Sequence, residues 1–197
     1  MLYNILIIVP PLLVAVMLHE IAHGYVALRL GDDTAKRQGR LTLNPIKHID
    51  PFMTVILPAL LIFTKSPVVI GGAKPVPINP MAFKDPRRGM LWVAAAGPAI
   101  NFVLAGLSFL GLLLWQFCIG SADSISMPVL VIGAWLEFGV VINIVLAIFN
   151  LIPIPPLDGG RIAVGILPIS LARRLASVER YGIIIVILLL YLLSSIW

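Results

Sequence analysis

Long apolar runs constrain the fold of this chain more than any other feature of its sequence. Four of them are candidate spans, at residues 2–30, 91–117, 130–153 and 178–197. Crossing a bilayer as a helix takes about 20 apolar residues, which each of these runs supplies. A fifth run, residues 51–64, is too short and suits a re-entrant or short membrane segment. We therefore expect an all-α polytopic membrane protein with about four transmembrane helices and one such segment.

Composition supports the same class. The chain has 197 residues, of which 60% are hydrophobic and 12% charged, with a mean hydropathy of +1.05. This is far more apolar than a soluble domain. The first run is too long for a signal-peptide core and lacks a basic start, so we keep it as a mature helix. We expect one integral membrane domain over residues 1–197.

The positive charges predict an orientation. All 14 lysines and arginines lie in or beside loops 31–90 and 154–177, which share one side if the chain crosses four times. Loop 118–129 and both termini lie on the other side and carry none. The positive-inside rule makes the basic side cytoplasmic and places both termini outside. This arrangement explains the net charge of +5 without a nucleic acid partner.

A metal-binding pattern lies within the first apolar run, at His19-Glu20-Ile21-Ala22-His23. In a helix, His19 and His23 lie one turn apart on one face, so both imidazoles can bind one metal ion. Glu20 points about 100° away, within reach of a water beside the metal, where it can act as a general base. Ionisable groups at membrane depth are costly and functional by default. We therefore expect a metal centre inside the membrane.

A second group of polar residues offers the third ligand. Asn143 and Asn150 lie two turns apart on one helix face, and a proline-rich stretch then leads to Asp158. Broken backbone at membrane depth is tolerated only where protein covers it or where it lines a wet cavity. Asp158 lies at the cytoplasmic end of its span, and His23 is about 9 Å from Arg29 at the same boundary. Depth therefore favours Asp158 as the third ligand.

Other candidate ligands are less well placed. Glu137 lies near the opposite end of its span, and Glu179 has no convincing position. Asp50 and Asp85 each precede a proline and are better explained as helix caps. We expect His48, in the cytoplasmic loop, to be solvated rather than a ligand. The single cysteine, Cys118, excludes an intramolecular disulfide and a Cys-rich zinc site.

The large cytoplasmic loop contains a short repeat and a possible hairpin. Asn44-Pro45 with Asp50-Pro51, and Asn79-Pro80 with Asp85-Pro86, have the same spacing, and each Asp-Pro pair predicts a helix start. Between the copies, residues 66–77 have β-branched residues around Gly71-Gly72, which indicates a possible small β-hairpin. Its edge could hold an extended peptide by strand addition. A plain connecting loop is the alternative.

The span 91–117 predicts a close helix contact. It opens with Ala94-Ala95-Ala96-Gly97-Pro98, and small residues let two helices approach closely. We expect this surface to contact the metal-bearing helix. Asn101 follows on the same helix, either as a packing group bonded to a neighbouring helix or as a group near the substrate.

Two stretches together resemble the site-2 protease family of intramembrane zinc metalloproteases. They are HEIAHG at residues 19–24 and NLIPIPPLDG at residues 150–159. The resemblance implies one zinc ion per chain bound by His19, His23 and Asp158. It also implies Glu20 as the catalytic base and Asn150 as a substrate-binding or site-ordering residue.

The same resemblance implies a function and a location. The expected reaction is hydrolysis of peptide bonds in the transmembrane segment of a membrane-anchored protein, as in regulated intramembrane proteolysis. The chain is similar to a minimal form without a PDZ or CBS domain, in a bacterial-type cell membrane. The expected active site lies near the cytoplasmic side of the lipid bilayer.

The main alternative function is a divalent-metal transporter that uses the same His and Asp groups. A transporter needs no base beside its ligands, so loss of Glu20 separates the two hypotheses. A scaffold with an inert metal is a third possibility, but a closed structural site usually has four protein ligands.

Overall fold

The computed structural model describes residues 2–64, 71–119, 126–182, 184, 185 and 188. Its described residues form helices, turns and extended segments, without a strand. Three helices are long and apolar enough to cross a membrane: α1 (Leu2–Arg29), α4 (Pro86–Ile119) and α5 (Met127–Asn150). The protein is therefore an all-helical integral membrane protein.

These three helices correspond to the first three predicted spans. The fourth, residues 178–197, lies largely outside the described residues, so the predicted count of four is not confirmed. Helix α5 ends at Asn150, three residues before the predicted end. Pro153 explains the difference, because proline has no N–H for the helix and disfavours helical backbone just before it.

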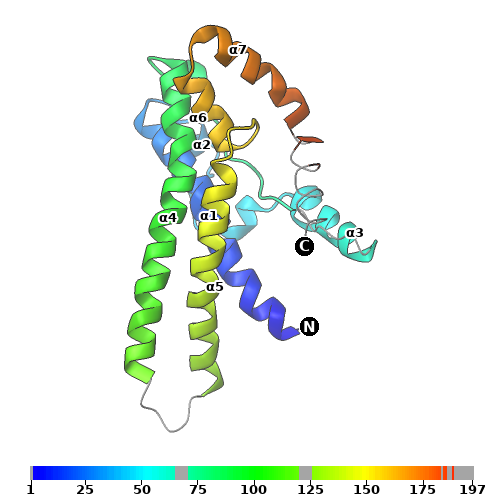
Figure 1. Ribbon diagram of the computed structural model, residues 1–197, viewed down its shortest axis with the longest axis vertical. Coiled ribbons are helices and arrows are strands. Elements are labelled where there is room, and N and C mark those ends of the chain that lie inside the picture. The colour runs from blue at the N-terminus through cyan, green and yellow to red at the C-terminus, as the bar shows by residue number, and fades with distance from the viewer. Residues whose placement is uncertain (1, 65–70, 120–125, 183, 186–187, 189–197) are drawn as a thin grey trace.

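The long helices pack together through small residues. Helices α4 and α5 run side by side in opposite directions, and α1 packs against both (Figure 1). A Cβ atom built at Gly133 would lie 2.7 Å from the Trp115 ring, and one at Gly139 would lie 2.8 Å from the Ser108 hydroxyl. Glycine therefore sets the close approach of α4 and α5, in the way typical of membrane helices.

The two predicted helix starts, at Asp50-Pro51 and Asp85-Pro86, are confirmed, and Asn44 and Asn79 cap short helices in the same way. The side-chain oxygens of Asn44, Asp50, Asn79 and Asp85 each accept a backbone N–H from the residue two positions further on. The elements that follow them are η1 (Pro45–His48), η2 (Pro51–Ile56), η3 (Pro80–Ala82) and α4. These residues are therefore structural caps, as the sequence predicted for Asp50 and Asp85.

The short apolar run at 51–64 folds as two short helical pieces, the π-helix η2 and then α3 (Leu57–Phe63). Together they are shorter than a membrane-crossing helix. The predicted hairpin at 66–77 is not confirmed, because residues 65–70 lie outside the described residues and residues 71–77 form no strand. Residues 71–79 are an irregular segment, which we call the strap.

The remaining short helices gather at one end of the long ones. These are α2 (Thr34–Arg37), α6 (Asp158–Ile166), α7 (Ile169–Val178) and the 3-10 helix η4 (Glu179–Tyr181). Figure 1 shows α2, α6 and α7 at the end where α4 begins. The Arg87 guanidinium fastens α6 to the start of α4 by donating to the carbonyl oxygens of Val164 and Leu167.

Candidate active site

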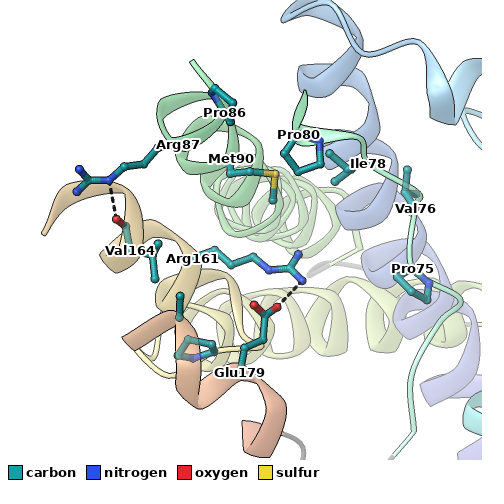
Figure 2. A pocket seen from close by; sticks show the side chains of 12 residues that line it. Pro75, Val76, Ile78, Pro80, Pro86, Arg87, Met90, Arg161, Val164 and Glu179 are labelled. Atoms are coloured by element: carbon teal, nitrogen blue, oxygen red, sulfur yellow. Dashed lines mark hydrogen bonds and ion pairs between the residues drawn. The ribbon is translucent and has the colours of Figure 1, made fainter. Parts of the chain in front are cut away.

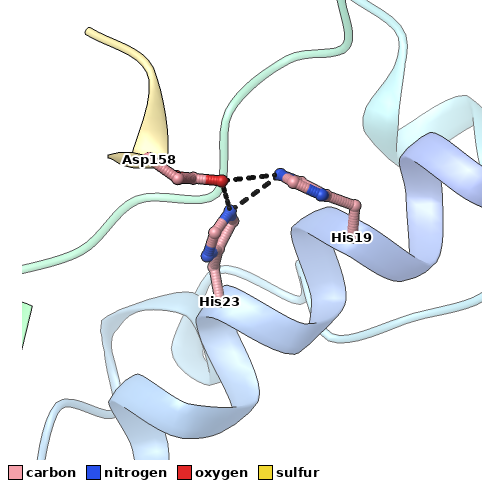
Figure 3. Close-up of side chains that lie close together, drawn as sticks. All are labelled: His19, His23 and Asp158. Carbon is pink, nitrogen blue, oxygen red and sulfur yellow. Dashed lines mark hydrogen bonds and ion pairs between the residues drawn. The ribbon is translucent and has the colours of Figure 1, made fainter. Parts of the chain in front are cut away.

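Two histidines one helical turn apart and an aspartate distant in the sequence converge in one cluster (Figure 3). His19 and His23 lie on α1, and Asp158 is the first residue of α6. The two Nε2 atoms lie 3.0 Å apart, and Asp158 Oδ2 lies 3.1 Å from one and 3.3 Å from the other. All three residues are buried. The structure thus brings together the three ligands that the sequence predicted.

Hydrogen bonds on the far side of each ring assign its tautomer. His23 Nδ1 lies 2.7 Å from the Val93 carbonyl oxygen, which can only accept, so this nitrogen carries the proton. His19 Nδ1 lies 2.6 Å from Asn101 Oδ1 and donates to it. In the neutral form of each ring, Nε2 then presents a lone pair to Asp158, as in metal sites where an outer partner fixes the imidazole.

A chain of amides fixes the orientation of Asn101. Its Nδ2 donates to Asn143 Oδ1 at 2.7 Å, and Asn143 Nδ2 donates to the Gly139 carbonyl at 2.8 Å. That carbonyl can only accept, so each amide in the chain has a defined direction and Asn101 must offer its oxygen to His19. Asn101 is therefore bonded to both neighbouring helices, as the packing hypothesis predicted, and it also orders a candidate ligand.

The three converging atoms fit a bound zinc ion. Asp158 Oδ2 is buried and has no hydrogen-bond partner in the described structure, and it faces two nitrogen lone pairs. Such a cluster of acceptors is unfavourable unless a cation lies among them. Ligands about 2.0–2.2 Å from an ion at tetrahedral angles lie roughly 3.3–3.6 Å apart, close to the distances observed here. The donor set, two imidazoles and one carboxylate, is one that zinc prefers.

Glycines leave the space that this cluster needs. A Cβ atom at Gly97 would lie 2.4 Å from the His19 ring and 2.6 Å from the His23 ring. One at Gly159 would lie 2.1 Å from the Leu151 carbonyl oxygen, and one at Gly160 would lie equally close to the Pro155 nitrogen. The absence of side chains at these positions lets α4 press against the histidines and lets α6 begin against the proline-rich loop, which places Asp158.

Glu20 lies beside the cluster in a cavity of about 290 Å³. The cavity is lined by the three candidate ligands, Glu20, Asn150 and parts of the strap, α4 and α6. Glu20 Oε2 accepts the backbone N–H of Val76, in the strap, at 2.8 Å. Asn150 donates from Nδ2 to the Leu146 carbonyl within its own helix at 3.0 Å. Both residues thus face the space next to the candidate ligands.

A second cavity, of about 580 Å³, adjoins the first (Figure 2). Pro75, Val76, Ile78, Met90 and Arg161 line both cavities. Across the second cavity, the Arg161 guanidinium pairs with the Glu179 carboxylate at 3.1 Å. The walls are otherwise mainly apolar, so the two cavities together form a recess between the strap and helices α4 and α6.

The other candidate residues lie elsewhere. Glu137 is exposed on α5, and Glu179 is engaged by Arg161, so neither joins the cluster. The expectation that His48 is solvated was wrong: it is 4% exposed, and its Nε2 donates to the Thr42 carbonyl at 2.8 Å. Asn44 caps η1, which ends at His48, and the His48 carbonyl accepts the N–H of Lys74 in the strap, so this histidine is buried where the loop meets the strap.

Several residues around the site were not predicted from the sequence. The Val93 carbonyl is a backbone group and leaves no signal in the sequence. Asn143 was noted for its position on a helix face, without its bond to Asn101. Arg40 was counted only among the basic residues of the loop and Asp32 was not considered, yet both are buried and both bind the strap.

Fold and site together define an integral membrane protein with a candidate two-histidine, one-aspartate metal centre between its helices. The sequence profile described as Peptidase family M50 matches residues 7–194, nearly the whole chain. The chain belongs to this family, the site-2 proteases, as the two sequence motifs indicated.

Relatives with similar sequences carry matching names. The "Putative zinc metalloprotease YwhC" of Bacillus subtilis strain 168 is 39% identical over 178 residues, which cover 90% of this chain and 77% of the relative. The "Putative zinc metalloprotease Rip2" of Mycolicibacterium smegmatis is 34% identical over 181 residues, 90% of this chain and 64% of the relative. The protein of the same name from Mycobacterium tuberculosis H37Rv is 28% identical, and the chain spans 63% of it. No solved structure gives a significant match to this chain.

Proposed function

We propose that this protein is an intramembrane zinc metalloprotease that hydrolyses peptide bonds within the transmembrane segment of a membrane-anchored substrate. One observation carries the proposal: the lone pairs of His19, His23 and Asp158 converge beside the Glu20 carboxylate, in a cavity within apolar helices. Family membership and the names of the relatives support the same reaction.

The residues present would hold the metal and leave room for chemistry. His19, His23 and Asp158 would be its three protein ligands, and three ligands are typical of catalytic rather than structural zinc. When bound, zinc supplies Lewis-acid chemistry, activating water at neutral pH and polarising a carbonyl group. The stoichiometry we propose is one ion per chain.

Glu20 supplies the proton transfers. One of its oxygens is held by the Val76 N–H, and the carboxylate faces the cavity next to the ligands. In the proposed reaction, Glu20 accepts a proton from the attacking water and returns it to the amine that leaves when the peptide bond breaks. Asn101 keeps its role of holding His19 in the tautomer that binds metal.

The substrate would enter as an unwound segment. A helix in lipid keeps its carbonyl groups in hydrogen bonds, so the scissile carbonyl must be freed before attack. The recess formed by the two cavities has room for a short extended peptide and for water. Asn150, at the broken end of α5, is placed to contact this peptide or to order the site.

We also propose that the site lies on the cytoplasmic side, with a single domain spanning the chain and the N-terminus outside. The end of the bundle that carries the site also carries Arg87 and Arg161 and the basic helix α2. This distribution supports the orientation that the positive-inside rule predicts.

The proposal predicts that helix stability in the substrate controls the rate of cleavage. Replacing a leucine near the cut with glycine weakens a helix by about 1 kcal/mol, so cleavage should become about fivefold faster. The measurement is the initial rate with purified protein and a single-span substrate in liposomes, with the same substitution ten or more residues from the cut as control. Equal rates for the two variants would contradict intramembrane cleavage by this route.

A further inference from the structure

The strap forms neither a helix nor a strand and lines both cavities; Figure 2 shows Pro75, Val76 and Ile78 along one side of the second cavity. Backbone polar groups in such a segment need partners elsewhere if they are buried. Val76, at its centre, is 6% exposed and donates its N–H to Glu20 Oε2 at 2.8 Å. The segment therefore contacts the candidate base directly through its backbone.

Glycine lets the strap lie against α1. A Cβ atom at Gly24, one residue after the second histidine of the motif, would lie 2.8 Å from a Val76 methyl group and 3.2 Å from the Ala35 Cβ atom. Position 24 thus has no room for a side chain while the strap and α2 are in place. Val76 is held by this contact as well as by its bond to Glu20.

Asp32 binds the strap three residues after Val76. Its carboxylate is 1% exposed, and its two oxygens accept the N–H groups of Asn79, at 2.6 Å, and Thr34, at 3.0 Å. Burial by itself would raise the pKa of Asp32, but these hydrogen bonds outweigh it and hold the pKa below its usual range. Because the pKa is lowered on folding, the contribution of this carboxylate to stability is present at neutral pH and is lost only in acid.

Arg40 binds the strap two residues before Val76. It is 5% exposed, and its guanidinium donates to the Lys74 carbonyl oxygen at 2.6 Å. The Lys74 N–H donates in turn to the His48 carbonyl at 2.8 Å. A buried charge is costly unless it is hydrogen-bonded. Both buried charges thus use strap backbone as a partner, one on each side of Val76.

We infer that Asp32 and Arg40 are positioning residues for catalysis: they fix the strap so that the Val76 N–H orients the Glu20 carboxylate. This inference rests on the proposed function. It makes the strap a segment that positions Glu20 and not a strand that binds the substrate, because residues 74–77 have no free N–H group to donate to a substrate. Lys74 and Val76 already donate within the protein, and Pro75 and Pro77 have none. Strand addition of a substrate along these four residues would therefore receive no donor from the strap.

The first test removes each anchor and compares it with a neighbour. Asp32→Asn and Arg40→Gln should lower kcat about tenfold to hundredfold, as expected when a catalytic group is misplaced by about 1 Å. Zinc content should stay at the wild-type level, because neither residue touches the candidate metal ligands. Arg40→Lys keeps a charged donor and should recover most of the lost kcat.

The matched controls are Asp33→Asn and Arg37→Gln. These residues form an exposed ion pair in the same loop, at 2.9 Å, and make no bond to the strap. Both variants should behave as wild type. Equal kcat values for the anchor variants and these controls would overturn the inference, while absence of cleavage by wild-type protein would instead contradict the proposed function.

The second test removes the N–H itself. Val76→Pro has no backbone donor for Glu20, whereas Val76→Ala keeps the donor, and both variants lose the valine side chain. The kcat of the proline variant should therefore be about tenfold or more below that of the alanine variant. If Asp32 acts through this bond, combining Asp32→Asn with Val76→Pro should lower kcat no further than Val76→Pro alone. Losses that multiply in the double variant would overturn the inference. The Val76 pair, compared at equal zinc content, tests the role of the N–H even if Asp32→Asn does not fold, and equal kcat values for the two Val76 variants would overturn the inference.

Discussion

Glu20→Gln is expected to abolish peptide cleavage and to leave the zinc content of the purified protein unchanged. Glutamine has the same shape, and its amide oxygen can still accept the Val76 N–H, but it cannot take up a proton from water. General bases contribute about 10²–10⁴-fold to rate, so the loss in kcat should be at least about 100-fold. The measurement pairs metal analysis with the cleavage rate on a single-span substrate.

The same variant separates a protease from a metal transporter. In proteoliposomes, a transporter would keep its zinc flux when Glu20 is replaced, because its ligands remain. The protease hypothesis predicts no cleavage by the variant and no zinc flux from the wild type. Cleavage by Glu20→Gln at the wild-type rate would exclude Glu20 as the general base.

Asp158→Ala is expected to lose both zinc and activity. Oδ2 of this residue is the oxygen that faces the two Nε2 atoms, and removing it leaves only two protein ligands. Loss of outer partners of metal ligands costs about 10–100-fold in metal affinity, so loss of a direct ligand should cost at least about 100-fold. Zinc titration of the purified variant measures this directly.

Glu137→Gln is the control for that experiment. Glu137 is an exposed carboxylate on α5 outside the cluster, so its replacement should preserve both zinc binding and cleavage. If Glu137→Gln lost zinc while Asp158→Ala kept it, the metal centre would have to lie elsewhere in the protein.

Local sequence patterns predicted the parts of the site that depend on local geometry. The spacing of His19 and His23 follows from the helical repeat, and the Asp50-Pro51 and Asp85-Pro86 pairs start helices because capping is a matter of adjacent residues. Asp158 was predicted as a ligand because the prolines before it end the preceding helix and place this carboxylate at the cytoplasmic end of its span. These features need no knowledge of which helices are neighbours.

The parts that escaped prediction depend on contacts between distant segments. Arg40 and Asp32 bind backbone atoms 34 and 47 residues away, and a backbone partner leaves no trace in the sequence. The same applies to the Val93 carbonyl behind His23, 70 residues from it. Residues 71–77, the described part of the possible hairpin, form no strand, and their backbone groups bind side chains and loop carbonyls instead.

The position of the cut in a substrate tests the central claim most directly. Purified protein and a single-span substrate would be incubated in liposomes, and the masses of both products would locate the cleaved bond. We predict a cut inside the transmembrane segment, in its cytoplasmic half, because His23 lies about 9 Å from the boundary at Arg29 while the hydrocarbon core is about 30 Å thick. Cuts found only in the loops outside the membrane would contradict intramembrane proteolysis and would indicate a membrane-anchored peptidase.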